Sequence, residues 1–329
     1  MNKRKLGRTN LHISELCLST SKFRWIDDEA AAFGLLDAYR SHDGNFIQNV
    51  GTCPGTAGAQ TVTDQGEAIV GRWHQRRAIP RDSLVLATRI DLLRPVHGGS
   101  ISFANLIRES CENSLRRLQT NHLDLLICEW DDQLTPVEDL LEAVDRLQQA
   151  GIVRHVVAGG FPPWRVVDSL HRSGQRNHCR FEAMEAEFSL ITRMRFEGEA
   201  LAMCREHRLG FLARSPLAGG FLAPPPLSTR DLANVEPTWQ NERFGNSGGD
   251  AVLAALAKLT EEGGATPAQI ALAWVLRNPE VSAAVVSPTS PGDLHELIQA
   301  SGLQLSADGV CALNEASRAP SHGLALQHA

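Results

Sequence analysis

Short apolar segments alternate with longer segments of helical periodicity along almost the whole of this chain. Eight of the short segments have the length and composition of buried strands, at residues 15–20, 45–48, 84–90, 123–128, 153–158, 181–186, 210–213 and 283–286. Nearly continuous apolar runs are typical of parallel strands whose two faces are both covered. Eight alternations in 329 residues favour a closed (β/α)8 barrel, an α/β fold, over two open sheets.

The intervening segments predict the helices of that barrel. Apolar residues recur at helical spacing over 27–40, 65–77, 103–118, 137–147, 164–173, 195–206 and 267–277. Residues 266–269, Thr-Pro-Ala-Gln, have the pattern of a capping box that begins the last of these helices. We expect one barrel domain over residues 1–329, with a hairpin at 4–6 and 12–13, further helices at 250–259 and 307–316, and a lid or binding loop at 222–249.

Composition and charge exclude several classes of function. The net charge of -6 comes from 32 basic and 38 acidic residues without a basic stripe, so we expect no nucleic-acid partner. Seven cysteines show no metal-ligand spacing, which predicts no metal site and reduced thiols in a cytoplasmic protein. No apolar run is long enough to cross a bilayer, and we expect no membrane association. No GxGxxG loop follows the first strand, which argues against a dinucleotide-binding open sheet.

Several longer motifs resemble those of the aldo-keto reductases. RKLGRTNLHISEL is similar to the opening hairpin of that family, LRRLQTNHLDLL to its third helix and fourth strand, and SPLAGGFL to the loop after its seventh strand. PAQIALAWVLRNPEV resembles its seventh helix, and GNFIQNVGTC its second strand, usually close to NFIDTAxxY. The resemblance implies a (β/α)8 barrel whose active site lies at the carboxyl ends of the strands. It also implies descent from enzymes that reduce carbonyls with NADPH.

The four catalytic positions of that family carry other residues in this chain. By the resemblance, Gln48 stands in place of the Asp and Cys53 in place of the proton-donating Tyr. Arg89 replaces the Lys, and Glu129 replaces the His at the end of the fourth strand. The single tyrosine, Tyr39, falls on the apolar face of the first helix, where a core position is expected. The resemblance therefore assigns the catalytic positions to residues without the usual chemistry.

The positions that hold the nicotinamide cofactor in that family have also changed. By the resemblance they fall on Thr20, Gly159, Gly160, Glu185, Arg214, Ser215, Ser287 and Thr289. Gly159 and Gly160 replace the Ser-Asn that holds the nicotinamide amide, Glu185 replaces a Gln, and Arg214 replaces the stacking aromatic. Free N–H groups at the helix start Ser290-Pro291 are still able to hold an anion. We expect no resident cofactor, and at most weak or altered binding of NADP(H).

The new residues introduce opposite charges at the expected barrel mouth. Placed as in the family, Arg89 and Glu129 come from neighbouring strands, and so do Glu185 and Arg214. Each pair puts a carboxylate beside a guanidinium. Such pairs either bind an anionic substrate or are ion pairs that fill a vacated site, since buried charges are kept when they are paired.

Three further side chains have two interpretations each. Cys53 is either a nucleophile or a small apolar residue. Trp25 and Trp130 either form walls of a substrate pocket or pack beneath the loops. The expected partner is a small-molecule substrate, and the sequence leaves the oligomeric state open.

Three functional hypotheses follow. The first is a repurposed barrel that binds a small polar or anionic metabolite and performs non-redox acid/base chemistry, with Glu129 as acid or base and Arg89 and Arg214 as anion anchors. The second is an NADPH-dependent reductase with an atypical site. Family members that reduce carbon–carbon double bonds do carry Glu in place of the catalytic His, but they keep the Tyr and Lys. The third is a catalytically inactive regulatory or interaction subunit.

Overall fold

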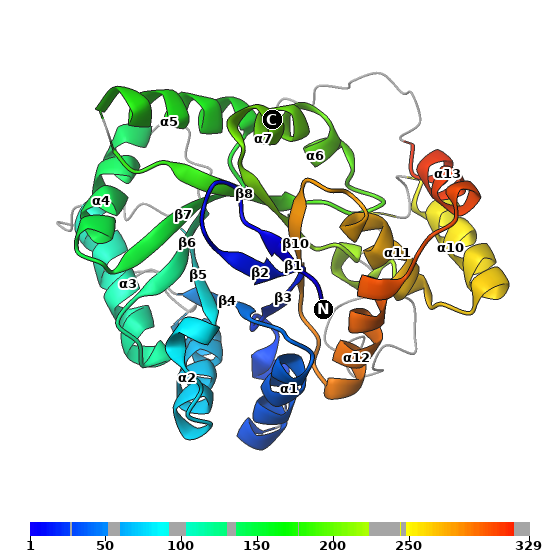
Figure 1. Cartoon of the computed structure of the whole chain (residues 1–329), viewed down its shortest axis with the longest axis horizontal. Helices are drawn as coiled ribbons and strands as arrows, with labels where there is room; N and C mark the ends of the chain where they lie inside the picture. Colours follow the sequence, from blue (N-terminus) through cyan, green and yellow to red (C-terminus); the bar gives the residue numbers. More distant parts are fainter. Residues whose placement is uncertain are drawn as a thin grey trace.

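Eight parallel strands close into a barrel in the computed structural model, which describes residues 1–26, 28–51, 60–91, 103–129, 136–176, 178–223, 244 and 248–318 (Figure 1). The strands follow one another around the barrel in the order of the sequence, with β10 closing on β3. Their bounds are β3 Leu16–Ser19, β4 Phe46–Gly51, β5 Val85–Asp91, β6 Leu123–Glu129, β7 Val153–Gly159, β8 Phe181–Glu187, β9 Gly210–Arg214 and β10 Val281–Val286. The predicted (β/α)8 barrel is confirmed.

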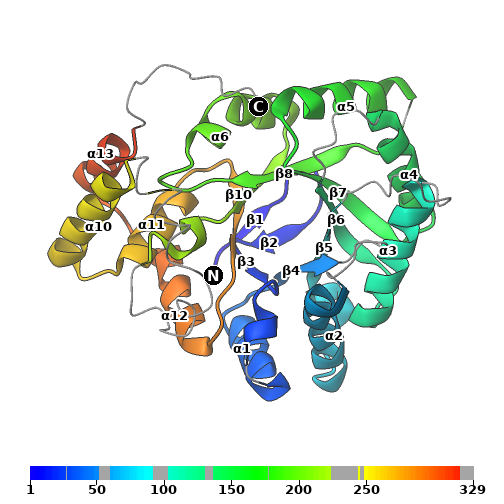
Figure 2. The same cartoon turned by 180° about the vertical axis from the view of Figure 1, so that it is seen from behind.

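Helices surround this barrel on the outside in both views of Figures 1 and 2. They are α1 Glu29–Ser41, α2 Gln60–Arg76, α3 Phe103–Leu118, α4 Val137–Gln149, α5 Pro163–Arg176, α6 Met194–Glu197, α7 Glu199–His207, α10 Gly249–Gly263, α11 Pro267–Leu276, α12 Pro291–Gln299 and α13 Ala307–Ala316. The segment expected as one helix at 195–206 is divided at Gly198, whose ψ of -125° lies outside the helical range. Both halves of the capping box at Thr266 and Gln269 are formed. None of the described helices is long and apolar enough to cross a membrane.

The hairpin of β1 Lys3–Lys5 and β2 His12–Ser14 closes the amino-terminal end of the barrel. Leu6 and Ile13 of the hairpin belong to the same buried cluster as the inward-facing side chains of the strands. Gly7 has φ +50°, and a Cβ there would collide with the backbone of Glu182 and Gly210, which lie where β8 and β9 begin. The predicted hairpin is therefore present, and its turn lies against the starts of these strands.

Inward-facing residues change from apolar to charged toward the carboxyl ends of the strands. Along β5 the residues Val85 and Ala87 belong to the interior cluster, and along β6 so do Leu125 and Ile127. Because side chains two residues apart share one face of a strand, the next inward positions on these strands are Arg89 and Glu129. The interior of the barrel is thus mainly apolar, and the last inward layer carries charged side chains. Most of the predicted loop at 222–249 lies outside the described residues.

Tyr39 anchors α1 to the barrel at the end opposite that charged layer. Its side chain is fully buried, and its hydroxyl oxygen lies 2.8 Å from the carbonyl oxygens of Leu16 and Phe46, the first residues of β3 and β4. The expected core position is correct, and the hydroxyl adds polar contacts that the apolar spacing did not predict. Tyr39 is consequently remote from the carboxyl ends of the strands.

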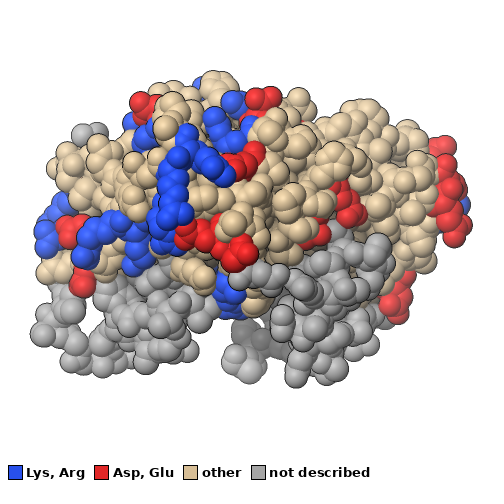
Figure 3. Space-filling view, turned by 90° about the horizontal axis from the view of Figure 1, so that it is seen from below, with Lys and Arg blue, Asp and Glu red and all other residues tan. Residues whose placement is uncertain are grey.

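Basic and acidic side chains lie close together on one part of the face shown in Figure 3, which is the molecule of Figure 1 seen from below. Ion pairs join the two helices: Arg72 and Arg76 of α2 lie 2.6 and 2.7 Å from Glu29 of α1. Arg77, just after α2, lies 2.8 Å from Asp37. Basic side chains on this face therefore have acidic neighbours.

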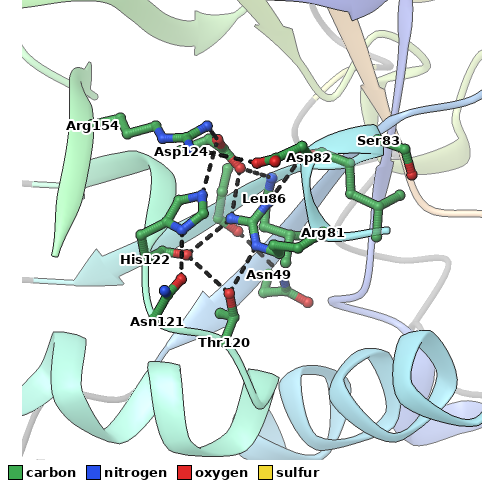
Figure 4. Close-up of polar contacts among 12 residues, drawn as sticks. Asn49, Arg81, Asp82, Ser83, Leu86, Thr120, Asn121, His122, Asp124 and Arg154 are labelled. Carbon is green, nitrogen blue, oxygen red and sulfur yellow. Dashed lines mark hydrogen bonds and ion pairs between the residues drawn. The ribbon is translucent and has the colours of Figure 1, made fainter. Parts of the chain in front are cut away.

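The buried carboxylate of Asp124 links the amino-terminal ends of β5, β6 and β7 through ion pairs and a hydrogen bond (Figure 4). Asp124 of β6 is 1% exposed and lies 2.7 Å from Arg81 and 2.9 Å from Arg154. It also accepts a hydrogen bond of 2.9 Å from the N–H of Leu86 in β5. Because the carboxylate is paired on both sides, its burial is compensated.

We expect Asp124→Ala to lower the free energy of unfolding by about 3–5 kcal/mol, because it leaves the largely buried guanidinium group of Arg81 without its carboxylate. The control is Asp168→Ala, which removes the partly exposed ion pair with Arg172 within α5 and should cost no more than about 1 kcal/mol. Urea denaturation of both variants measures the difference. Equal losses would contradict a structural role for Asp124.

Candidate active site

Four charged side chains converge at the carboxyl ends of the strands, and we call them the four-charge cluster: Arg89 of β5, Glu129 of β6, Glu185 of β8 and Arg214 of β9. Glu129 lies between the two guanidinium groups. Its Oε2 is 3.2 Å from Nη1 of Arg89, and its Oε1 accepts a hydrogen bond of 2.5 Å from Nη1 of Arg214. The expected contact between Glu129 and Arg89 is confirmed.

The pairing expected between Glu185 and Arg214 is not the closest one. In the register of β8 and β9, Arg214 lies opposite Glu187, one inward position nearer the mouth than Glu185. Arg214 therefore reaches Glu129, whereas Glu185 lies 3.7 Å from Arg89. Sequence neighbours suggest pairs along the sheet, but inward-pointing side chains also meet across the barrel.

Glu185 is the most deeply buried member of the cluster, with no exposed side-chain surface. Neither of its carboxylate oxygens has a hydrogen-bond partner of good geometry within the described part of the chain. Burial raises the pKa of Glu185, and the charge of Glu129 adds to this, although Arg89, Arg214 and the nearby amide of Gln48 oppose it. The buried environment thus favours the neutral acid.

Two glycines leave space beside Glu129 at the end of β7. A Cβ at Gly160, which has φ +70°, would lie 3.6 Å from Oε1 of Glu129. A Cβ at Gly159 would lie 3.0 Å from the Ile127 side chain and 3.4 Å from Cα of Glu129. The glycines therefore permit the carboxylate of Glu129 to approach the strand end without a side chain in between.

A cavity of about 330 Å³ adjoins the cluster. Arg89, Arg214 and Gln48 form part of its wall, together with Ser215 and Ser287. Its volume falls at the lower end of the range for small-molecule sites. Both guanidinium groups therefore line the cavity and also contact Glu129, which is partly exposed and is not itself among the lining residues.

Positive charge predominates in the described lining of this cavity. Lys22, Arg89 and Arg214 are its cationic residues, and Asp293 is its one carboxylate among the residues that the structure describes. A cavity lined mainly by one sign of charge attracts ligands of the opposite sign. The lining therefore favours an anionic ligand.

The anion site expected at the start of α12 is filled by the protein's own groups. Ser290 caps the helix by accepting a hydrogen bond from the N–H of Asp293, and Asp293 Oδ2 accepts from both the N–H and the hydroxyl of Thr289. The N–H groups of Thr289 and Asp293 at this helix start are therefore engaged by the protein's own oxygens. We missed Asp293 in the sequence, although Ser290 followed three residues later by an acid is the pattern of a cap.

The remaining predicted site residues divide between the wall and the surrounding structure. Thr20 is buried and donates a hydrogen bond of 3.0 Å to Asn49, so its hydroxyl is engaged within the fold. Trp25 lies in the short helix η1 Phe23–Trp25 beneath Arg24, whose guanidinium carbon is 4.4 Å from the ring centroid. Cys53 and Trp130 lie outside the described residues.

Comparison with known proteins places this barrel in a family. The sequence profile of the Aldo/keto reductase family matches residues 62–318. The chain belongs to that family. It is 29% identical over 318 residues to "Uncharacterized oxidoreductase YrpG" of Bacillus subtilis (strain 168), with 94% of each chain covered.

More distant relatives of the chain carry different names. Identity is 27% over 315 residues to "Norsolorinic acid reductase stcV" of Emericella nidulans, covering 91% of this chain and 77% of the relative. Identity is 24% to "Probable voltage-gated potassium channel subunit beta" of Arabidopsis thaliana, covering 91% of each. Family membership thus spans relatives named as oxidoreductases and one named as a channel subunit.

We expect Glu185→Gln to stabilise the protein increasingly as the pH rises. The folded state holds the Glu185 proton more tightly than the unfolded state does, so wild-type stability is full below the unfolded pKa and falls as the pH rises toward the folded pKa. The amide does not titrate, and its advantage should grow by up to about 1.4 kcal/mol per pH unit within that window. Urea denaturation of both proteins between pH 5 and pH 8, chosen to span about three units, measures it. A difference in the free energy of unfolding that stays constant over this pH range would contradict the raised pKa of Glu185.

Proposed function

We propose that the protein binds a small polar or anionic metabolite at the barrel mouth and moves a proton on it without hydride transfer, in a cyclisation, dehydration or isomerisation. The observation that carries the proposal is the position of Glu129 between two guanidinium groups that line the same cavity. In this proposal the carboxyl group of Glu129 accepts the proton.

The two arginines have separate roles in this proposal. Each guanidinium has five N–H donors, so contact with Glu129 leaves others for a ligand carboxylate or phosphate. The same positive charge stabilises an oxyanion that develops when Glu129 removes a neighbouring proton. Glu129 then returns the proton to another atom of the ligand, and the protein ends in its starting state.

Several features count against NADPH as the partner in this reaction. The family members that reduce carbonyls use a Tyr and a Lys, and the resemblance puts Cys53 and Arg89 at those positions. Asp293 adds a carboxylate at the start of α12, in the nucleotide-binding loop of the family, where it opposes a 2′-phosphate. The residues at this end of the cavity do not fit NADP(H), and no step of the proposed reaction uses it.

Two other functions have specific support. The names of the Bacillus and Emericella relatives favour an oxidoreductase, which in this chain would have an atypical site. The name of the Arabidopsis relative, a channel subunit, favours a regulatory or interaction subunit. Tests of proton transfer and of cofactor binding separate these functions from the proposed one.

Proton transfer can be tested before the substrate is known. We expect the wild-type protein, incubated in heavy water with a panel of small carboxylic acids, to catalyse exchange of a carbon-bound hydrogen in at least one of them. Glu129→Gln should reduce that exchange at least about a hundredfold, because the amide keeps its shape and cannot accept the proton. Proton NMR of the acids measures the exchange.

The matched control for this experiment is Glu182→Gln, which changes an acid on β8 that lies three residues before Glu185 and contacts Arg180. It should exchange at the wild-type rate. Full exchange by a folded Glu129→Gln variant would remove Glu129 from the mechanism. No exchange with any acid would count against the proposal and favour a regulatory role.

Cofactor binding gives a separate prediction. We expect NADPH to bind with a dissociation constant well above the micromolar range, since each missing charge-assisted hydrogen bond weakens binding by about 1.5–3 kcal/mol. Reduction of common aldehydes should be near background. Asp293→Asn should tighten NADPH more than NADH, because only NADPH carries the 2′-phosphate. Calorimetry that gives a sub-micromolar constant, or aldehyde turnover at ordinary enzyme rates, would support the oxidoreductase function instead.

A further inference from the structure

We propose that the cavity binds a carboxylate anion together with one proton, and that Glu185 takes up that proton. This inference rests on the proposed function, since it requires an anion bound at Arg89 and Arg214. It adds the protonation state of the complex and the residue that controls it. Glu185 is not part of the described cavity wall, so it acts through Arg89 as a positioning residue.

Glu185 and a bound anion would share the same guanidinium group. Arg89 lines the cavity on its outer side, and its Nη1 lies 3.7 Å from Oε1 of Glu185 on the inner side. Glu185 is fully buried, and its two oxygens lack hydrogen bonds within the described chain, so Arg89 and Arg214 are its main charge compensation. A bound anion that also interacts with Arg89 and Arg214 adds negative charge near Glu185. The ionised form of Glu185 is then less well stabilised.

The formal charges of the four-charge cluster indicate how an added anion changes the protonation of Glu185. At a pH where Glu185 is ionised in the free protein, the formal charges of the two arginines and two carboxylates sum to zero, so an added monoanion would leave one excess negative charge in a largely buried site. Uptake of one proton by Glu185 restores neutrality, and a buried site strongly favours that state. The proton comes from solvent and forms an O–H bond on the carboxylate, and no other bond changes.

The charged or titratable groups that face Glu185 come from β3, β5, β6 and β9. Arg89 of β5 and Arg214 of β9 are guanidinium cations, and the carboxyl group of Glu129 on β6 lies between them. The Cys17 thiol of β3 is fully buried, and burial together with the charge of Glu185 raises its pKa, so it stays protonated. Gln48 of β4 does not titrate. Burial already raises the pKa of Glu185, which makes it the group nearest to changing its state.

The sign of the pH dependence follows from this linkage. A bound anion raises the pKa of Glu185 further, so the complex holds more protons than the free protein between the two pKa values. Affinity for the anion therefore falls as the pH rises through that window and is constant below and above it. With one proton per anion the slope approaches about tenfold per pH unit.

The test uses glycolate as the probe and glycolamide as its uncharged match. Calorimetric titration in two cationic buffers of different ionisation enthalpy counts the protons taken up per glycolate bound. We expect uptake approaching one proton in wild type, affinity that falls as the pH rises, and no binding of glycolamide. Glu185→Gln should bind glycolate with no proton uptake and no pH dependence. The control Glu182→Gln should behave as wild type.

The outcomes separate this inference from the proposed function. Glycolate binding that is lost in Arg214→Gln but is pH-independent in wild type and takes up no protons would overturn the role of Glu185 alone. Equal proton uptake by wild type and Glu185→Gln would assign the proton elsewhere and also overturn it. Absence of glycolate binding by wild type, or binding unchanged in Arg214→Gln, would overturn both. Should Glu185→Gln fail to fold, the proton count and pH profile of wild type decide the question.

Discussion

The compensation of charge in the last inward layer of the barrel is the constraint on which the site depends. Below that layer the interior is apolar, with Ala87, Ile127 and Ala183 on the strands that carry the charges. A charge above such a core has little water on its inner side and must be neutralised by another side chain. Glu129 meets this requirement for both arginines at once.

The same constraint gives the two carboxyl groups different characters. Glu129 is partly exposed and touches two guanidinium groups, whereas Glu185 is fully buried and touches one at a longer distance. Two carboxyl groups in such different environments are typical of sites that transfer protons. The mouth of this aldo/keto reductase barrel therefore holds two carboxyl groups in different environments beside the same two guanidinium groups.

Charge also distinguishes the two ends of the cavity. Arg89, Arg214 and Lys22 bring positive charge to its lining, while Asp293 brings negative charge at the start of α12. A helix N-terminus that already holds its own carboxylate has little remaining attraction for a phosphate. The described positive charge of the cavity therefore lies mainly at the strand ends, beside Glu129.

The sequence by itself determined the barrel, its opening hairpin and the strand ends that carry Arg89, Glu129, Glu185 and Arg214. It could do so because strand and helix periodicity are local, and because long motifs preserve the order of the elements. Three contacts became known only from the tertiary structure. Arg214 contacts Glu129, Glu185 is fully buried near Arg89, and Asp293 accepts hydrogen bonds from Thr289 at the start of α12. These facts depend on register and on side chains that cross the barrel, which spacing along one chain does not encode. Burial set the difference between the two glutamates, because the free energy of a charge depends on everything packed around it.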